Sequence, residues 1–323
     1  MKKLLALLLC ACLCAAALGV GAYAVPLDSG TDALKAEFKG GSGGGLDYRY
    51  FAPAAEEGKK YPLVIWLHGV ASGNYAGDQI DSYDICKWVS DEFQARFANA
   101  GGAYVFAPRC PGGWDLASTA TLKSCIDSFI ARFDDIDTKR IYLIGFSVGA
   151  TMVLKTASRY PDFFAAAVPI SAVVQENSQV KALKNMAVWF FANERDGYVS
   201  ANVAATGNSF NQLKTVAADK SRVRFTAVSK AVTPSGAEVA TQHYMWRIVT
   251  NDMFMDDGSQ YAFSTTRDGT GETIRFTYPD GVIHWLSLQS KQEQAPSEPK
   301  ASFLQKILAF FRAIAAFFGN LFK

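Results

Sequence analysis

Histidine, metal-ligand motifs and runs of basic residues are scarce in this sequence. Only 3 of the 323 residues are histidine, and neither an HExxH nor a CxxC motif follows residue 24, so we expect no metal site and no cofactor. Lysine and arginine number 32 against 30 aspartate and glutamate. Because the positive and negative charges balance and no run of basic residues is present, we expect no positively charged surface that could bind a phosphate backbone. The sequence therefore argues against nucleic acid as a partner.

Apolar residues, by contrast, make up 50% of the chain, enough to build a core and to exclude disorder as the main state. The first 24 residues combine Lys2 and Lys3, a long apolar stretch, and small residues at Ala22 and Ala24. This pattern predicts a signal peptide, residues 1–24, and a protein that is secreted or held at the cell surface. An uncleaved membrane anchor is the alternative. Removal of Lys2 and Lys3 would leave 30 basic against 30 acidic residues.

Three of the six cysteines lie in the predicted signal peptide, which leaves Cys86, Cys110 and Cys125. An odd number allows at most one internal disulfide, and the spacing does not choose the pair. None of the three has a neighbouring histidine or a helix-start pattern that would make it a nucleophile. We therefore expect these cysteines to be buried or bridged.

The C-terminal end differs in composition from the rest. Residues 291–301, KQEQAPSEPKA, are polar and contain two prolines, which is typical of a linker. Residues 302–323 carry apolar side chains at alternating steps of four and three, which predicts an amphipathic helix. Arg312 interrupts it, so a membrane-spanning segment is not favoured. The helix could lie on a membrane surface, bind a partner or fold back on the main domain.

Between the ends, residues 40–290 alternate short apolar runs with helical stretches, which predicts one α/β domain with a mostly parallel sheet and helices on both faces. The expected strands are residues 47–52, 61–67, 103–108, 140–146, 165–170, 187–191 and 223–228. The first of these is expected to be antiparallel. The expected helices are residues 84–99, 119–133 and 148–159.

The segment Gly145-Phe146-Ser147-Val148-Gly149 lies between an expected buried strand and an expected helix. This is the context of a nucleophile elbow, a sharp turn that holds a serine side chain clear of the sheet. A side chain at either flanking glycine would collide with the neighbouring strand or helix. The alternative is a tight turn that merely contains serine. We predict that Ser147 is a nucleophile.

A serine hydroxyl needs a base to take its proton, and only three histidines are candidates. His243 follows the last expected strand, where the base belongs in the chain order Ser, Asp, His. His284 is the alternative, expected on a terminal helix. His68 directly follows strand 61–67, so we expect it to shape the loop rather than to act as the base.

The acid is expected after the strand at 187–191, where Asp196 lies in an Asp-Gly turn, with Glu194 as the fallback. Its role would be to orient His243. The backbone N–H groups of Val148 and Val70 are the expected oxyanion donors. A plain surface turn is the other interpretation of the Asp-Gly pair.

Several segments resemble exported α/β-hydrolases of the phospholipase/carboxylesterase-like group, including predicted peptidases and feruloyl-esterase-like enzymes. The shared segments are YPLVIWLHG (61–69), FAPRCPGGW (106–114), FDDIDTKRIYLIGFSVGA (133–150), FFAAAVPISA (163–172), ANERDGYV (192–199) and QHYMW (242–246). The resemblance implies an α/β-hydrolase fold, a triad of Ser147, Asp196 and His243, and Trp114 and Trp246 as residues that border the substrate pocket. The chain departs from the usual pattern at Ala150, at Met152-Val153-Leu154 and in the loop at 70–75, which bears on substrate choice.

The resulting hypothesis is an exported serine esterase that acts on a small or polysaccharide-linked ester through an acyl-enzyme. A serine peptidase of the prolyl-oligopeptidase type has similar triad chemistry, and a surface-binding protein that has lost turnover is a rival of another class. Residues 250–281 are the expected specificity segment because loops carry specificity in this architecture.

Overall fold

The computed structural model describes residues 31–70, 78–81, 84–97, 100–114, 117–173, 179–198, 201–232, 237–239, 241–250, 264–275 and 281–291. The predicted signal peptide at 1–24, all but the first residue of the predicted linker at 291–301, and the predicted helix at 302–323 lie outside these ranges. The chain divides into two compact units between Lys291 and Gln292.

The described residues contain one sheet of ten strands in the order β1-β2-β4-β3-β5-β6-β7-β8-β9-β10. The strands are β1 (Lys39–Gly43), β2 (Leu46–Phe51), β3 (Tyr61–Leu67), β4 (Tyr104–Arg109), β5 (Ile136–Phe146), β6 (Ala166–Ile170), β7 (Ala187–Asn193), β8 (Val223–Val228), β9 (Ser264–Asp268) and β10 (Thr273–Ile274). The run from β4 to β8 is parallel, and β1, β2, β9 and β10 pair antiparallel at the two edges. The prediction of a mostly parallel sheet is confirmed.

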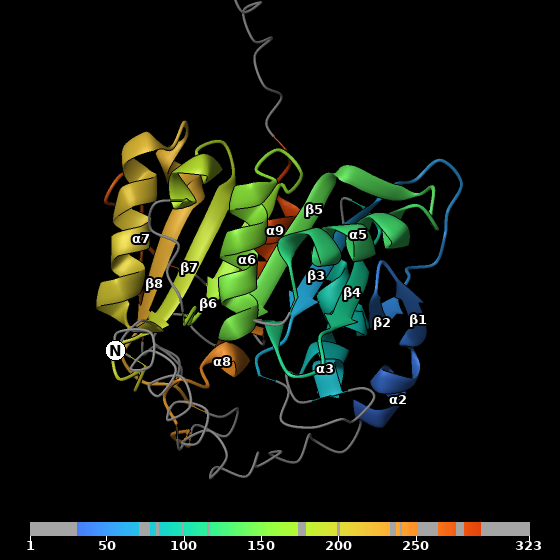
Figure 1. The fold of residues 1–323 in the computed structure, drawn as a ribbon, viewed down its shortest axis with the longest axis horizontal. Helices are drawn as coiled ribbons and strands as arrows, with labels where there is room; N and C mark the ends of the chain where they lie inside the picture. The colour runs from blue at the N-terminus through green and yellow to red at the C-terminus, as the bar shows by residue number, and fades with distance from the viewer. Residues whose placement is uncertain are drawn as a thin grey trace, which may run out of the picture. The chain divides into compact units, whose positions relative to one another are not determined.

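Helices cover both faces of this sheet (Figure 1). They are α2 (Thr31–Ala36), α3 (Asp78–Asp81), α4 (Asp91–Gln94), α5 (Thr119–Ile130), α6 (Val148–Arg159), α7 (Val203–Val216), α8 (Trp246–Thr250) and α9 (Val282–Ser287), with 3₁₀ turns at Ile85–Val89, Ala95–Phe97, Val180–Leu183 and Lys220–Arg222. The longest, α7, has 14 residues, fewer than the ~20 that a bilayer core requires. Within the described ranges, therefore, no helix could cross a membrane.

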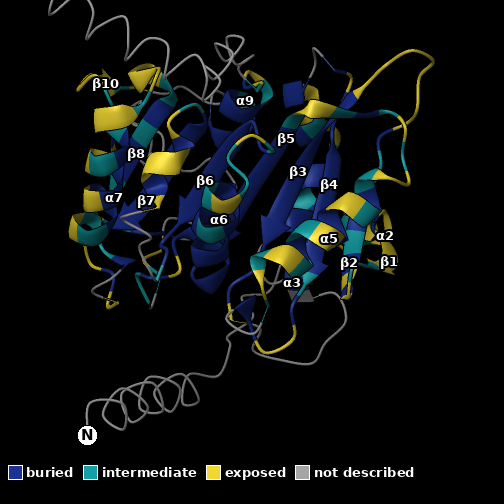
Figure 2. Cartoon of the chain, turned by 45° about the horizontal axis from the view of Figure 1, so that its top comes forward, coloured by how far each residue is buried: buried dark blue, intermediate teal, exposed yellow. Residues whose placement is uncertain are grey.

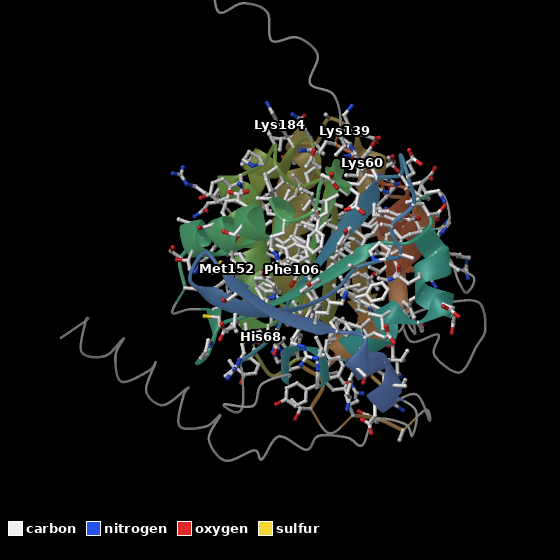
Figure 3. All side chains as sticks on the ribbon, turned by 90° about the vertical axis from the view of Figure 1, so that its right-hand side faces the viewer. Lys60, His68, Phe106, Lys139, Met152 and Lys184 are labelled. Atoms are coloured by element: carbon white, nitrogen blue, oxygen red, sulfur yellow. The ribbon has the colours of Figure 1, made fainter. Side chains whose placement is uncertain are left out.

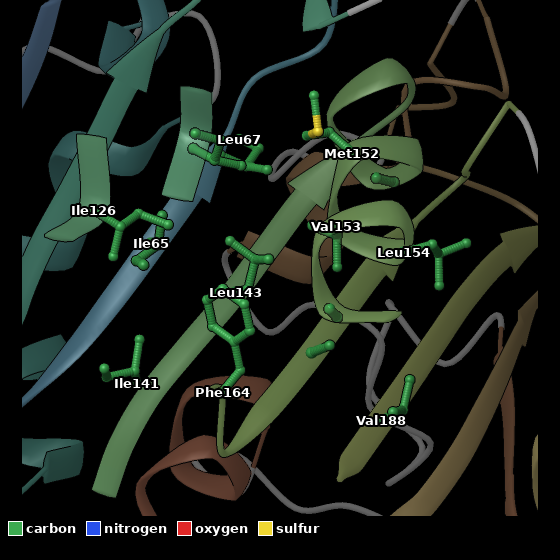
Figure 4. Packing of buried hydrophobic residues seen from close by; sticks show 14 of the residues in the cluster. Ile65, Leu67, Ile126, Ile141, Leu143, Met152, Val153, Leu154, Phe164 and Val188 are labelled. Carbon is green, nitrogen blue, oxygen red and sulfur yellow. The ribbon is translucent and has the colours of Figure 1, made fainter. Parts of the chain in front are cut away.

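Two apolar clusters, one on each face of the sheet, form the core. Successive residues of β3 alternate between them: Leu63, Ile65 and Leu67 pack with α5, α6 and α7, whereas Val64 and Trp66 pack with α8 and α9. Every residue of β3, β6 and β7 is buried, as expected of parallel strands covered on both faces (Figure 2). Figure 4 shows part of the cluster that contains Ile65 and Leu67 of β3, to which α6 contributes Met152, Val153 and Leu154.

Three local expectations are wrong. The single helix expected at 84–99 is broken, because Ser90 adopts an extended backbone between the 3₁₀ turn and α4 and its Oγ accepts a hydrogen bond from Phe93 N. The strand expected to begin at Arg140 begins at Ile136. Residues 264–268 and 273–274, within the 250–281 segment expected to be a loop, form the edge strands β9 and β10, while residues 251–263 and 276–280 lie outside the described residues. That this segment sets specificity stays a prediction.

Cys86, Cys110 and Cys125 are all buried, and no disulfide joins any two of them. Of the two fates expected from the sequence, burial is therefore the observed one. Cys125 lies on α5 and packs in the cluster that covers β3.

Candidate active site

The register of the sheet brings several strand ends to one edge. Leu67 pairs with Gly145, Phe146 with Ile170, Ile170 with Phe191, and Asn193 with Val228. The loops that follow β3, β5, β7 and β8 therefore leave the sheet at the same edge, where ligands bind in open α/β sheets. Figure 3 shows His68, just beyond β3, at the opposite end of the first unit from Lys60, Lys139 and Lys184.

Ser147 lies in a sharp turn between β5 and α6. Its φ of 57° and ψ of −120° are strained for a residue with a side chain, at a cost of about 1–3 kcal/mol. Two backbone hydrogen bonds hold the turn: Ser147 N donates to Ile170 O at 2.9 Å, and Thr151 N donates to Ser147 O at 3.0 Å. This strand–turn–helix geometry is that of a nucleophile elbow.

The two glycines of the elbow are required by close packing, as predicted. A Cβ on Gly145 would lie 2.8 Å from the backbone of Gly149 and 3.0 Å from Leu67 Cβ. A Cβ on Gly149 would collide with the carbonyl oxygens of Leu67 and His68. The missing side chains let the end of β3 approach the first turn of α6, so the loop that carries Val70 begins next to Ser147.

Ser147, His243 and Asp196 form a continuous hydrogen-bonded chain. His243 Nε2 lies 3.0 Å from Ser147 Oγ, and His243 Nδ1 lies 2.7 Å from Asp196 Oδ2. Because an ionised carboxylate only accepts, Nδ1 carries the proton and Nε2 is left to accept the serine proton. His243 is 3% and Ser147 7% exposed, so this hydrogen-bonded chain is largely shielded from water. This is the geometry that a serine triad requires.

The two alternative residues take other positions. Glu194 is exposed, and its backbone N donates to Val228 O, whereas Asp196 occupies the hydrogen-bonding position at His243. His284 lies on α9, the terminal helix expected for it. The structure thus brings Ser147, Asp196 and His243 together, and neither Glu194 nor His284 belongs to this hydrogen-bonded chain. Their catalytic roles stay predictions.

Gln242 joins the loop of His243 to the loop of Asp196. Its Oε1 accepts hydrogen bonds from Asn193 Nδ2 at 3.0 Å and Ala231 N at 2.8 Å, and its Nε2 donates to Val239 O at 3.1 Å. Nε2 also lies 3.2 Å from Glu238 Oε1, which Arg195 Nη2 binds at 2.5 Å. Sequence reasoning missed Gln242, since a polar residue beside a histidine carries no signal of these contacts.

His68 shapes the loop after β3, as expected. Its Nδ1 lies 2.6 Å from Gly69 O, and its Nε2 accepts a hydrogen bond from Cys110 N at 3.1 Å, which fixes the proton on Nδ1.

The two predicted oxyanion donors lie at the start of this loop and at the start of α6. Val70, two residues after His68, is 55% exposed. Val148 N is the first amide of α6, and helix-initial amides have no partner within the helix. Val148 and Val70 stay the predicted oxyanion donors.

The two tryptophans expected to border the substrate are buried. Trp114 packs its ring 5.3 Å from the His68 ring, and Trp246 begins α8 within the cluster on the other face of the sheet. Their substrate-binding role stays a prediction.

Two tyrosines that sequence reasoning passed over, Tyr198 and Tyr244, contact the His243 ring and are exposed. Their positions beside the predicted acid and base were the available signal.

Among the described residues, no group of three or more histidine, cysteine, aspartate or glutamate side chains could hold a metal ion. The candidate site consists of a hydroxyl, an imidazole and a carboxylate joined by hydrogen bonds, beside the start of α6.

Comparison with known proteins identifies the family. The family model described as alpha/beta hydrolase fold matches residues 67–265, more than half of the chain. The chain belongs to the alpha/beta hydrolase fold family. The matched range contains all three residues of the hydrogen-bonded chain.

The individual proteins that follow share 30% sequence identity or less with this hydrolase-fold protein. A bifunctional acetylxylan esterase/xylanase of Neocallimastix patriciarum is 30% identical over 141 residues, 42% of this chain and 19% of that protein, so the chain spans about a fifth of that relative. A crystal structure of a thermostable esterase superposes with a TM-score of 0.60 at 23% identity, covering 80% of this chain and 64% of that one. An acylaminoacyl peptidase in complex with Z-Gly-Gly-Phe-chloromethyl ketone gives a TM-score of 0.45 at 15% identity, covering 68% and 41%.

Proposed function

We propose that this protein is an exported serine esterase that cleaves carboxylic esters through an acyl-enzyme on Ser147. The observation that carries the proposal is the hydrogen-bonded chain from Ser147 Oγ through His243 to Asp196. The elbow strain at Ser147 supports it, because a strained backbone persists only where the surrounding structure holds it.

In the proposed mechanism, Ser147 Oγ attacks the ester carbonyl carbon while His243 Nε2 takes the hydroxyl proton. Asp196 holds Nδ1–H and stabilises the imidazolium. As the carbon–oxygen bond to the alcohol breaks, Nε2 gives the proton to the alcohol oxygen, and the acyl group stays on Ser147. Water then attacks the acyl-enzyme with His243 as base, which releases the acid and restores Ser147.

The negative oxygen of each tetrahedral intermediate would accept hydrogen bonds from Val148 N and Val70 N. Val148 N lies at the N-terminus of α6, whose dipole favours negative charge. Loss of one such donor typically costs about 2.7–4 kcal/mol of transition-state stabilisation.

Covalent labelling tests whether the site is active. A fluorophosphonate probe should label the wild-type protein and His284→Ala, and should not label Ser147→Ala. If the folded wild-type protein is not labelled, a binding protein without turnover becomes the better account.

Substrate ranking tests the reaction class. The printed name of the curated relative, acetylxylan esterase, favours ester hydrolysis and a small or polysaccharide-linked ester as substrate. 4-Nitrophenyl acetate or a feruloyl ester should be cleaved with a higher kcat/KM than aminoacyl anilides. The reverse ranking would favour a peptidase of the prolyl-oligopeptidase type.

We further propose that the protein is secreted or held at the cell surface, and that residues 302–323 bind a membrane surface. The phenylalanine-rich pattern of that segment supports the second proposal. Full-length protein should co-sediment with liposomes more than a chain that ends at Lys291. Equal partitioning of the two would argue for a protein partner or for packing on the main domain.

A further inference from the structure

Large apolar side chains that are exposed gather at the candidate site. Over the described part of the chain there are five: Val70, Tyr198, Val216, Tyr244 and Leu288. Three of these lie one or two residues after a residue of the site. Val70 comes two residues after His68, Tyr198 two after Asp196, and Tyr244 one after His243.

The two tyrosines pack against the imidazole itself. The ring centroids of Tyr198 and His243 are 4.6 Å apart, and those of Tyr244 and His243 are 6.2 Å apart. His243 is 3% exposed, whereas Tyr198 is 41% and Tyr244 45% exposed. The tyrosines thus cover the imidazole with one part of their surface and offer the rest to solvent.

Both tyrosines are held at their backbones. Tyr198 N donates to Asp196 Oδ1 at 2.8 Å, and Tyr244 N donates to Thr241 O at 2.9 Å. The Tyr244 ring also makes an edge contact with Phe146, at a centroid distance of 6.3 Å. The backbone hydrogen bonds fix the main chain, and the ring contacts with His243 and Phe146 restrict the side chains before a ligand arrives, so the entropy lost on binding is smaller than for mobile side chains.

The chemistry of acyl transfer says which part of the ester these rings meet. His243 Nε2 must reach the alcohol oxygen to protonate it as the carbon–oxygen bond breaks. The carbonyl oxygen, in contrast, points to Val148 N and Val70 N. The alcohol part of the ester therefore leaves beside the imidazole, whose ring both Tyr198 and Tyr244 contact.

We propose that Tyr198 and Tyr244 bind the alcohol part of the ester and that this alcohol is a sugar ring. The inference rests on the proposed esterase function. A tyrosine presents a flat apolar face and a hydroxyl at its edge. A pyranose has the matching surface, an apolar C–H face ringed by hydroxyls.

Acetate esters of different alcohols test the proposal, because all of them form the same acetyl-enzyme and differ only in binding of the ester and in the step that expels the alcohol. We would compare ethyl acetate, cyclohexyl acetate and a monoacetylated methyl xylopyranoside. Tyr198→Ala and Tyr244→Ala should each lower kcat/KM for the sugar ester, relative to ethyl acetate, about tenfold, equivalent to about 1.4 kcal/mol. The loss should appear mainly as a higher KM.

Matched variants separate ring contact from general damage. Tyr198→Phe and Tyr244→Phe keep the rings and should retain most of the preference, and Leu288→Ala, an exposed apolar residue outside the site, should leave every kinetic constant unchanged. An equal loss for all three esters would mean that the tyrosines only position the imidazole. An equal loss for cyclohexyl and sugar esters would mean an apolar alcohol. Either result overturns the proposal.

A binding measurement keeps this inference distinct from the proposed function. Methyl xylopyranoside and xylotriose should bind to Ser147→Ala, detected by saturation-transfer NMR, and should not bind to Ser147→Ala that also carries Tyr198→Ala and Tyr244→Ala. Failure of the Ser147→Ala protein to bind either sugar overturns the sugar site even if wild-type protein hydrolyses esters. Sugar binding without any ester hydrolysis would support the sugar site and refute the esterase.

Discussion

Replacing Gln242 with alanine should weaken both the fold and the candidate site, because this one side chain connects the two loops that supply the base and the acid. Its Oε1 accepts hydrogen bonds from Asn193 at 3.0 Å and Ala231 at 2.8 Å, and its Nε2 lies 3.1 Å from Val239 O and 3.2 Å from Glu238 Oε1. Alanine removes all of these at once.

The magnitude follows from the groups left behind. Asn193 and Ala231 are fully buried, so Asn193 Nδ2 and Ala231 N would each lose an acceptor away from water. An unsatisfied buried polar group costs about 1–3 kcal/mol. Gln242 is itself half-buried, which lets water replace part of the loss. We expect Gln242→Ala to lower the free energy of unfolding by about 2–4 kcal/mol.

Activity should fall as well, since Gln242 directly precedes His243 and Asn193 lies three residues before Asp196. Loss of the bond between the loops would let His243 Nε2 shift from its 3.0 Å position at Ser147 Oγ. Misplacement of a catalytic group by about 1 Å can cost about 10²-fold in rate. We expect kcat for 4-nitrophenyl acetate to fall about tenfold to hundredfold.

Urea unfolding and steady-state kinetics on the same preparations measure both effects. Gln212→Ala, a half-buried glutamine on α7, is the matched control and should change stability by less than about 0.5 kcal/mol. A double-mutant cycle with Asn193→Ala should give a coupling energy of about 0.5–3 kcal/mol. Stability and kcat within error of the Gln212→Ala control would refute the role given to this network.

Three further outcomes are expected. Asp196→Asn should keep the fold by circular dichroism and lower kcat about 10⁴-fold, because an amide no longer holds the proton on His243 Nδ1; a loss below tenfold would contradict the triad. Gly149→Ala should destabilise by about 3 kcal/mol or more in urea, because its Cβ would meet the Leu67 and His68 carbonyls, whereas Gly40→Ala has open space and should be tolerated. Burial raises the pKa of Cys125 to about 12, so above about pH 8.5 the unfolded thiol loses its proton while the folded one keeps it, and stability should fall with rising pH. Unfolding midpoints from pH 8 to 10 should fall less steeply for Cys125→Ala, and equal slopes would contradict this cause.

Local sequence patterns were sufficient for the elements around the candidate site. The limits of β3, α6 and β8 were predicted to the residue, because a strand buried on both faces requires a short continuous apolar run and a helix requires apolar residues that recur every three to four positions. Gly145 and Gly149 identified the elbow because β3 and α6 pack too closely there to leave room for a side chain at either position.

Other parts could not be predicted because they depend on partners distant in sequence. Strands β1, β9 and β10 are rich in glycine, serine and threonine, and only pairing with β2 and β8 makes them strands. The break at Ser90 reflects a side chain that bonds its own backbone in competition with the helix. The exposure of Tyr198 and Tyr244 likewise follows from which neighbours the fold supplies.

The amino-acid sequence alone predicted the class of fold and the three candidate side chains, Ser147, Asp196 and His243. It could do so because the turn-forming residues and the order serine, aspartate, histidine can be read along the chain without knowledge of its tertiary contacts. The tertiary structure decided whether an imidazole could reach a hydroxyl 96 residues away and a carboxylate 47 residues away. That distance is set by strand order and register from β5 to β8, and by Gln242 between the two loops. Pairing across a sheet is a property of many distant contacts together, and no local window of sequence contains it.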